Sequence, residues 1–176
     1  MSALCHSYLC GRNTAEWLIK VEQLRIRYAS MADYNGVEKI MKQVQELHIN
    51  LRPDIYQPID IVLPYEEFCK AVEQRTLIVA DQNEDVVGVL SYVHRHIESD
   101  KQVTRDVMFI DCVAVVERLR GRGIGRKLFE FAQNILHKES FDGLELQVNA
   151  QNQNARRFYE NYGFKEKSIN MELCFY

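Results

Sequence analysis

Three glycines, spaced one residue apart, lie within a strongly basic stretch of the sequence. Gly121, Gly123 and Gly125 allow the backbone to turn tightly and a ligand to approach it closely. The cations around them are Arg118, Arg120, Arg122, Arg126 and Lys127. Such a turn suits a polyanion, because a pyrophosphate accepts hydrogen bonds from consecutive backbone N–H groups and is attracted by the cations.

The residues on either side of this turn predict how it is held in place. Residues 113–116 form a short apolar run, which is typical of a buried strand. From Ile124 onwards, apolar residues recur every three or four positions, as in Leu128 and Phe131, and this spacing predicts a helix. The glycine turn therefore connects a strand to a helix N-terminus, where free N–H groups favour a bound anion.

Two common phosphate-binding loops do not match this turn. A P-loop requires Gly-x-x-x-x-Gly-Lys-Ser/Thr, and no lysine followed by Ser or Thr stands at that spacing. A dinucleotide-binding loop requires a third small residue, where the sequence has Leu128 or, in the other register, Arg126. A third pattern, Arg/Gln-x-x-Gly-x-Gly/Ala, is matched by Arg120, Gly123 and Gly125.

Together with a second motif further along, this third pattern resembles the GNAT superfamily of acyl-CoA-dependent N-acetyltransferases. The second motif, at the distance expected for that family, is Asn152-x-x-Ala155-x-x-x-Tyr159-x-x-x-Gly163-Phe164. The resemblance runs loosely from Leu24 to Tyr176 and is most specific from Phe109 to Phe164. It implies an α/β (α+β) fold: a mixed central sheet of six to seven strands, four main helices on both faces, and splayed fourth and fifth strands.

The resemblance also implies how acetyl-CoA, the expected cosubstrate, is bound. The backbone N–H groups of residues 121–126 would hold the pyrophosphate. The fourth strand would pair its backbone with the pantetheine amides, and Asn152 would contact the pantetheine arm. The full set of expected coenzyme-binding residues is Val113, Ala114, Val115, Arg120, Gly121, Arg122, Gly123, Ile124, Gly125, Arg126, Asn152, Ala155 and Tyr159.

Acetyl transfer to an amine needs a proton donor for the leaving thiolate, and the resemblance assigns this role to Tyr159. A phenol, with a pKa of about 10 against about 8.5 for a thiol, can serve as that donor. The alternative is a core tyrosine that packs the last helix.

The amine also has to be neutral when it attacks, and we expect Asp111 to act as the base. On a regular strand Asp111 shares a face with Phe109 and Val113, and a carboxylate in so apolar a run is unusual. Many family members carry glutamate at the position of Phe109, which leaves a water chain ending at Asp111, or a purely structural acid, as alternatives.

The acceptor pocket is expected between the first helices and the third and fourth strands. Its candidate residues are Glu46, His48, Tyr56, Tyr92 and His94. His94 and His96 share one strand face, but with no third ligand in view we expect no metal and interpret them as solvated histidines at a strand edge.

The whole chain limits the classes of function. It has 176 residues, a net charge of −3 and 47% hydrophobic residues, which predicts one globular domain and disfavours nucleic-acid or membrane partners. Five scattered cysteines without a CxxC pair indicate reduced thiols and a cytoplasmic protein. No apolar run reaches the roughly 18 residues that span a bilayer, and no signal peptide is evident.

The expected domain is residues 23–176, preceded by an extension of residues 1–22 that could form a short helix. Within the domain, the expected order is β-α-α-β-β-β-α-β-α-β, with Lys165–Tyr176 as the last strand or strands. The expected function is acetyl transfer from acetyl-CoA to a small-molecule amine or a protein N-terminus, with a homodimer possible. The alternative is a CoA-binding module with a sensing or structural role and little turnover.

Overall fold

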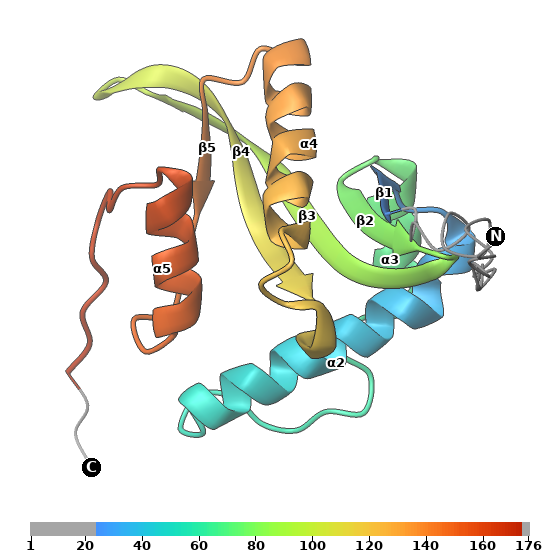
Figure 1. The fold of residues 1–176 in the computed structure, drawn as a ribbon. Helices are drawn as coiled ribbons and strands as arrows, with labels where there is room; N and C mark the ends of the chain where they lie inside the picture. Colours follow the sequence, from blue (N-terminus) through green and yellow to red (C-terminus); the bar gives the residue numbers. More distant parts are fainter. Residues whose placement is uncertain (1–23, 174–176) are drawn as a thin grey trace, which may run out of the picture.

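A computed structural model describes residues 24–173, so the predicted extension of residues 1–22 lies outside the described part. Five strands form one mixed sheet in the order β1-β2-β3-β4-β5. The first three pairings are antiparallel, and β4 and β5 are parallel (Figure 1). The strands are β1 (Leu24–Tyr28), β2 (Leu77–Gln82), β3 (Asp85–Ser99), β4 (Gln102–Val115) and β5 (Gly143–Leu146).

Two helices cover each face of the sheet, as predicted. On one face, α2 (Tyr34–Leu51) and α3 (Tyr65–Glu73) form a core around Val37, Ile40 and Phe68. On the other face, α4 (Ile124–Lys138) buries Leu128 and Phe129 against the sheet, and α5 (Gln153–Tyr162) packs against α4. No helix within residues 24–173 is long and apolar enough to cross a membrane.

The strand count differs from the expected six to seven. Residues 24–173 contain five strands, and the part of Lys165–Tyr176 that is described, up to Leu173, is neither strand nor helix. Towards its end, this segment alternates apolar and polar residues, with Ile169, Met171 and Leu173 as the apolar ones. Alternation makes a strand only where a neighbouring strand accepts its backbone hydrogen bonds, and within the described residues this segment has no such neighbour.

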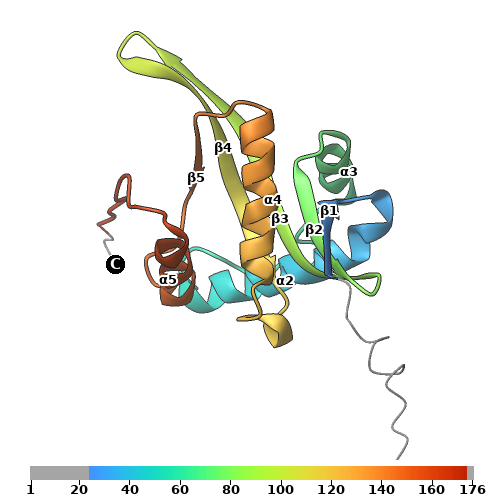
Figure 2. The ribbon, with the colours of Figure 1, turned by 45° about the horizontal axis from the view of Figure 1, so that its top comes forward.

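The polar stretch of residues 98–105 consists of the ends of β3 and β4 and the two-residue turn between them. β3 and β4 continue as a long hairpin whose pairing reaches Ser99 and Gln102. This arm projects beyond the helices and the rest of the sheet (Figure 2). Both faces of the arm are largely exposed, which explains why its sequence lacks the apolar alternation of a half-buried strand.

β4 and β5 are paired over only four positions, from Val107 with Gly143 to Ile110 with Leu146. β5 ends there, whereas β4 continues for five more residues to Val115. The predicted divergence of these two strands is therefore present. It leaves one edge of the last part of β4 without a strand beside it within the described residues.

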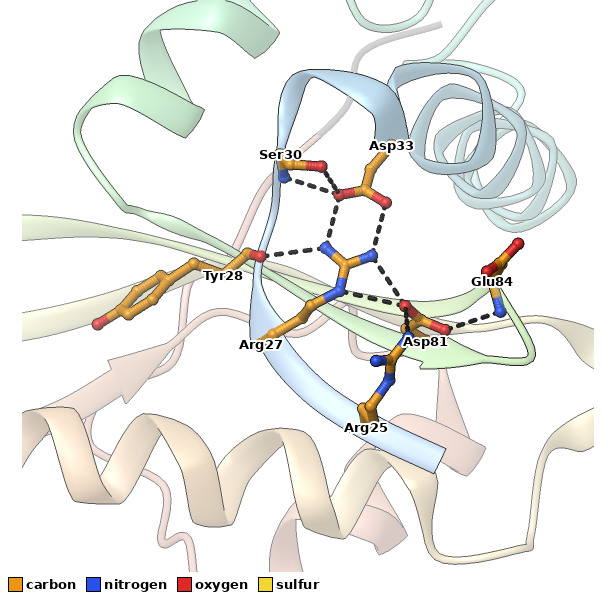
Figure 3. A network of polar contacts seen from close by, with 7 residues as sticks. All are labelled: Arg25, Arg27, Tyr28, Ser30, Asp33, Asp81 and Glu84. Carbon is orange, nitrogen blue, oxygen red and sulfur yellow. Dashed lines mark hydrogen bonds and ion pairs between the residues drawn. The ribbon is translucent and has the colours of Figure 1, made fainter. Parts of the chain in front are cut away.

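A buried ionic network joins β1 and β2 to the start of α2 (Figure 3). Arg27 donates to both carboxylate oxygens of Asp33, at 2.7 and 2.9 Å, and to Asp81 at 2.9 Å. Both acids are almost fully buried, at 7% and 2% exposed. Arg27 therefore supplies a counter-charge to both buried carboxylates, and Arg25 supplies a second one to Asp81 at 3.2 Å.

Candidate active site

The open edge of β4 is the first component of the site. The N–H of Val116 donates to the Val87 carbonyl of β3, so this residue turns its backbone groups toward β3. Successive residues of a strand present their backbone groups to opposite edges. Val115 and Val113 therefore present N–H and C=O groups to the edge that β5 has left. An extended ligand can bind there as an added strand.

A β-bulge at Asp111 lies at the inner end of this edge. Ser91 pairs with Cys112 and Tyr92 pairs with Ile110, so Asp111 is the extra residue on β4. The bulge shifts the side-chain alternation, because a bulged residue is left out of the ladder. It also leaves the backbone of Asp111 outside the regular pairing with β3.

Because of this bulge, the environment of Asp111 differs from the one predicted. The prediction that Phe109, Asp111 and Val113 share one face is wrong. Val113 and Ile110 both pack into the core under α4. Phe109 is the neighbour of Ile110 in the strand, so its side chain points to the opposite face. The Asp111 side chain is exposed rather than buried in an apolar strand. Its carboxylate therefore needs no buried partner.

A short 3-10 helix, Glu117–Leu119, connects the end of β4 to the glycine turn. Gly121 and Gly123 have φ values of +76° and +81°, a left-handed conformation that glycine adopts without strain. A Cβ added at either position would have no atom within 4 Å, so both glycines face open space. The turn is therefore open to a ligand at both of these positions.

Gly123 is also the N-cap of α4, so the turn places a helix N-terminus at the same site. The first intrahelical hydrogen bond runs from Lys127 N to Gly123 O, at 3.1 Å. The N–H groups of the preceding residues point out of the helix end. No acidic residue lies in this first turn, and Arg122, Arg126 and Lys127 are exposed around it. The arrangement can hold a phosphate or pyrophosphate.

Two residues of the motif also hold the protein itself together. Arg120 Nε donates to the Val115 carbonyl at 3.1 Å and so fixes the turn to the end of β4. A Cβ on Gly125 would lie 3.3 Å from Cζ of Phe158, so this glycine lets α5 pack closely against α4. Each residue therefore has a structural role besides the coenzyme contact expected for it.

The second motif forms the start of α5. Asn152 is the N-cap, and its Oδ1 accepts a hydrogen bond from the N–H of Ala155 at 3.1 Å. This bond uses only the oxygen of the Asn152 side chain, so its NH₂ group can donate to another partner. Gly163 ends the helix with a φ of +114°, as expected for a C-terminal glycine.

Tyr159, one turn before the end of α5, lies in an aromatic cluster with Phe129, Phe158 and Phe164. Burial, with a smaller contribution from Cys112, raises the pKa of Tyr159 to about 12. The phenol therefore keeps its proton throughout the physiological pH range. Tyr159 is thus a core tyrosine whose hydroxyl stays protonated, which is compatible with the donor role expected for it.

Cys112 is a neighbour of this site that the sequence did not single out. Burial, together with the charge of Asp111, raises the pKa of the Cys112 thiol to about 12, so the thiol is neutral. Its Sγ lies 3.7 Å from Sδ of Met41, which links β4 to α2. The bulge brings about this placement, because it moves Cys112 to the α2 side of the sheet, and no sequence pattern indicated the bulge.

The structure brings together only some of the acceptor candidates. His48, near the end of α2, packs against Tyr56 with ring centroids 4.8 Å apart, and burial lowers the pKa of His48. Glu46 lies exposed on the same helix. Gln45 donates to the carbonyl of Gln57 at 2.9 Å and ties the loop after α2 to the helix.

Tyr92 and His94 lie elsewhere. Tyr92 is buried in the core on the α4 side, and its hydroxyl donates to the carbonyl of Arg75 at 3.2 Å. His94 is exposed on the hairpin arm, where its Nε2 lies 2.6 Å from Asp106. His96 contacts the same carboxylate, which raises the pKa of His96. These residues do not join His48 and Tyr56 in one pocket.

A hollow of about 510 Å³ opens on the α2 side of the end of β4. Its lining includes Lys39, Gln43 and Arg118. Arg118 belongs to the cations around the glycine turn, but none of the residues expected to bind the coenzyme lines this hollow.

Comparisons with known proteins agree with this geometry. The family model described as the acetyltransferase (GNAT) family matches residues 41–164. A single-site mutant of the BH1408 protein from Bacillus halodurans is 29% identical, with a TM-score of 0.80, over 86% of this chain and 99% of that one. A search of curated proteins finds no match.

Two more distant structures share the fold. Glucosamine-6-phosphate N-acetyltransferase from Arabidopsis thaliana is 21% identical, with a TM-score of 0.64, over 88% of this chain and 99% of that one. The aminoglycoside N-acetyltransferase AAC(6')-Iy, in complex with CoA, is 14% identical, with a TM-score of 0.64, over 86% and 99%. The fold and the site thus define an acetyltransferase. The chain belongs to the GNAT acetyltransferase family.

Proposed function

We propose that this chain transfers an acetyl group from acetyl-CoA to a primary amine, either a small molecule or a protein N-terminus, by direct attack on the thioester. The observation that carries the proposal is the continuity of two binding elements. The open edge of β4 is followed by the 3-10 helix Glu117–Leu119 and then by the left-handed glycine turn at the N-terminus of α4. This matches a ligand with an extended amide-containing arm that ends in a pyrophosphate.

The residues present fit the coenzyme. The N–H groups from Gly123 to Arg126 would hold the pyrophosphate, with Arg122 and Arg126 adding positive charge. Val113 and Val115 would pair their backbone groups with the pantetheine amides. Because Arg120 occupies the Val115 carbonyl, we expect Val113 and the N–H of Val115 to make these contacts.

The reaction forms a bond between the amine nitrogen and the thioester carbonyl carbon and breaks the bond from that carbon to sulfur. The amine loses a proton, and the thiolate gains one. Backbone N–H groups at the bulge would stabilise the negative charge that develops on the carbonyl oxygen. Tyr159 would donate its hydroxyl hydrogen bond to the leaving sulfur.

The high pKa of Tyr159 defines that role more closely. A phenol with a pKa of about 12 is a much weaker acid than an ordinary thiol, whose pKa is about 8.5, so complete proton transfer to the thiolate is unfavourable. Tyr159 would therefore stabilise the leaving thiolate chiefly by donating a hydrogen bond to it. The proton that the amine loses would finally protonate the thiolate. Asp111, exposed at the bulge, would accept the amine proton directly or through water.

The named activities of structural neighbours support an amine acceptor. Glucosamine-6-phosphate N-acetyltransferase and AAC(6')-Iy both act on amino groups by their names, although their identity to this chain supports the fold alone. We place the enzyme in the cytoplasm, where Cys69 and Cys112, both free thiols in the structure, would stay reduced.

The direct test is an acetyl-transfer assay against a panel of primary amines, with Tyr159→Phe and Tyr162→Phe compared with the wild type. Tyr162 lies in the same aromatic cluster, but its hydroxyl donates to Gln133 at 3.0 Å. We expect Tyr159→Phe to lower kcat by about 10²-fold and Tyr162→Phe to change it little. A wild type that binds acetyl-CoA yet acetylates no amine would favour the sensing module instead.

A further inference from the structure

The sheet face that α2 and α3 cover is left open beside the proposed reaction centre. The core under these two helices includes Val89 of β3 and Cys112 and Ala114 of β4. Val93 lies on the same face as Val89, four residues further along β3, and Phe109 is its partner on β4. Neither residue belongs to that core, as the described residues define it, and Val93 is 45% exposed.

Phe109 lies close to the place where the amine would react. Cys112 is on the same face of β4, and the bulge at Asp111 separates the two residues. Because the bulged residue takes no place in the ladder, Phe109 is only two ladder positions from Cys112, or about 7 Å along the strand. A group bound over Phe109 is therefore within the length of a small molecule from the bulge.

Arg95 is held over this phenylalanine. It follows Val93 by two residues on β3, so both side chains are on one face, and its Cζ lies 3.2 Å from the centre of the Phe109 ring. The N–H donors of a guanidinium lie in its plane, so stacking on a ring leaves them available to another partner. Arg95 is exposed, and among residues 24–173 no carboxylate forms an ion pair with it.

The neighbouring charges on this face leave an excess of positive charge. Glu145 of β5 is the partner of Phe109 on the other side of β4. Arg105 lies 3.2 Å from Glu145, and Lys167 lies 2.5 Å from it, so two cations share one carboxylate. With Arg95, three cations thus stand against one acid here, although the whole chain has a net charge of −3. This part of the surface favours an anion.

We propose that Arg95, held on Phe109, binds an anionic group of the acceptor, so that the preferred acceptors are primary amines that also carry a carboxylate or a phosphate. The paired N–H donors of a guanidinium match the oxygens of either group. Asp111 at the bulge attracts the ammonium end of such a molecule, and Arg95 binds its anionic end. Opposite charges at the two positions therefore orient the amine toward the thioester. The inference rests on the proposed acetyl transfer, because it names the acceptor of that same site.

The test uses pairs of amines that differ chiefly in the anion: β-alanine with β-alaninamide, and phosphoethanolamine with ethanolamine. Arg95→Met removes the charge but keeps an unbranched chain over Phe109, and Arg95→Lys keeps the charge without the paired donors. Lys101→Met is the control, because Lys101 is an exposed cation in the turn of the hairpin arm.

We expect the wild type to prefer the anionic member of at least one pair, and the pair shows whether the group is a carboxylate or a phosphate. In Arg95→Met, KM for that amine should rise by about 10- to 100-fold, while KM for its neutral counterpart and for acetyl-CoA changes less than about twofold. Arg95→Lys should lie between this variant and the wild type, and Lys101→Met should match the wild type.

Calorimetry of the same amines, with the protein saturated with CoA, measures acceptor binding without turnover. Anionic amines that bind through Arg95 but are not acetylated would support this site and contradict the proposed acetyl transfer. A wild type that acetylates the neutral and anionic members equally well would keep the acetyl transfer and overturn the inference. Equal losses for both members in Arg95→Met, an equal effect of Lys101→Met, or no binding of any anionic amine would also overturn it.

Discussion

Asp111 owes its exposure to a single extra residue in β4. A regular strand would have turned this carboxylate into an apolar environment, where an unpaired charge is expensive. The bulge instead leaves it exposed beside the open edge, where it can meet an incoming amine and water. A carboxylate in that position can accept a proton without an opposing buried charge.

We expect Asp111→Asn to lower kcat/KM for the amine by about 10²-fold at neutral pH, because the variant cannot accept the amine proton. The loss should shrink as the pH rises toward the amine pKa of roughly 10, where the neutral amine becomes abundant. A pH-rate profile measures both effects. Glu117→Gln, an exposed acid in the turn before the glycines, is the control. An Asp111→Asn profile that matches the wild type at every pH would rule out this role.

The aromatic cluster around Tyr159 depends in the same way on one residue, Gly125. Because a Cβ there would already lie 3.3 Å from Phe158, a larger side chain has to push α5 away from α4. The resulting displacement would move Tyr159 together with Asn152, since both belong to the same short helix or its cap.

At the scale of elements, we therefore expect Gly125→Leu to destabilise the fold by about 1–3 kcal/mol and to reduce turnover beyond the loss of stability. Denaturant unfolding and kcat, measured on the same preparations, separate the two effects. Ala132→Gly, on the buried face of α4, removes packing without displacing α5 and serves as the comparison. Wild-type turnover in Gly125→Leu would show that the spacing of α4 and α5 does not control the site.

The sequence was sufficient to predict most elements around the site. The four main helices, the two glycine motifs and the strand before the turn follow from apolar spacing and from glycines at helix ends. These are local signals, in which a residue's neighbours in sequence are also its neighbours in space.

The features that were missed depend on partners distant in sequence. The bulge at Asp111 arises from the register between β3 and β4, and the same residues would read as a regular strand in another pairing. The hairpin arm has no buried face to reveal it. Tyr92 was assigned to a pocket, although it lies in the core, because alternation shows a face and not what covers that face.

For the molecule as a whole, Arg27 connects the first strand to the rest of the fold. Burial alone would raise the pKa of Asp33, but hydrogen bonds from Arg27, and from the N–H and hydroxyl of Ser30, outweigh it and hold that pKa below its ordinary value. A folded-state pKa below the unfolded one means that the carboxylate stabilises the fold above the unfolded pKa of about 3.9. This contribution is lost as the pH falls through the folded-state pKa.

We expect Arg27→Met to lower the free energy of unfolding by about 3 kcal/mol at neutral pH, because it removes the cation that pairs with buried Asp33 and leaves Asp81 with Arg25 alone. The difference from the wild type should shrink as Asp33 becomes protonated in acid. Arg25→Met is the control: Arg25 also contacts Asp81, at 3.2 Å, but its side chain is 60% exposed, so we expect a loss of no more than ~1 kcal/mol. Denaturant titrations at neutral and acidic pH measure all three proteins, and equal losses in the two variants would contradict this account.

Acetyl-CoA binding at the glycine turn is tested most directly by calorimetry on two matched glycine variants. Gly123→Leu and Gly163→Leu both place a side chain at a left-handed glycine with nothing within 4 Å of the added Cβ, but only Gly123 lies at the proposed site. We expect comparable losses of stability in both and at least about tenfold weaker acetyl-CoA binding in Gly123→Leu alone. Unchanged acetyl-CoA affinity in a folded Gly123→Leu protein would contradict the proposed site.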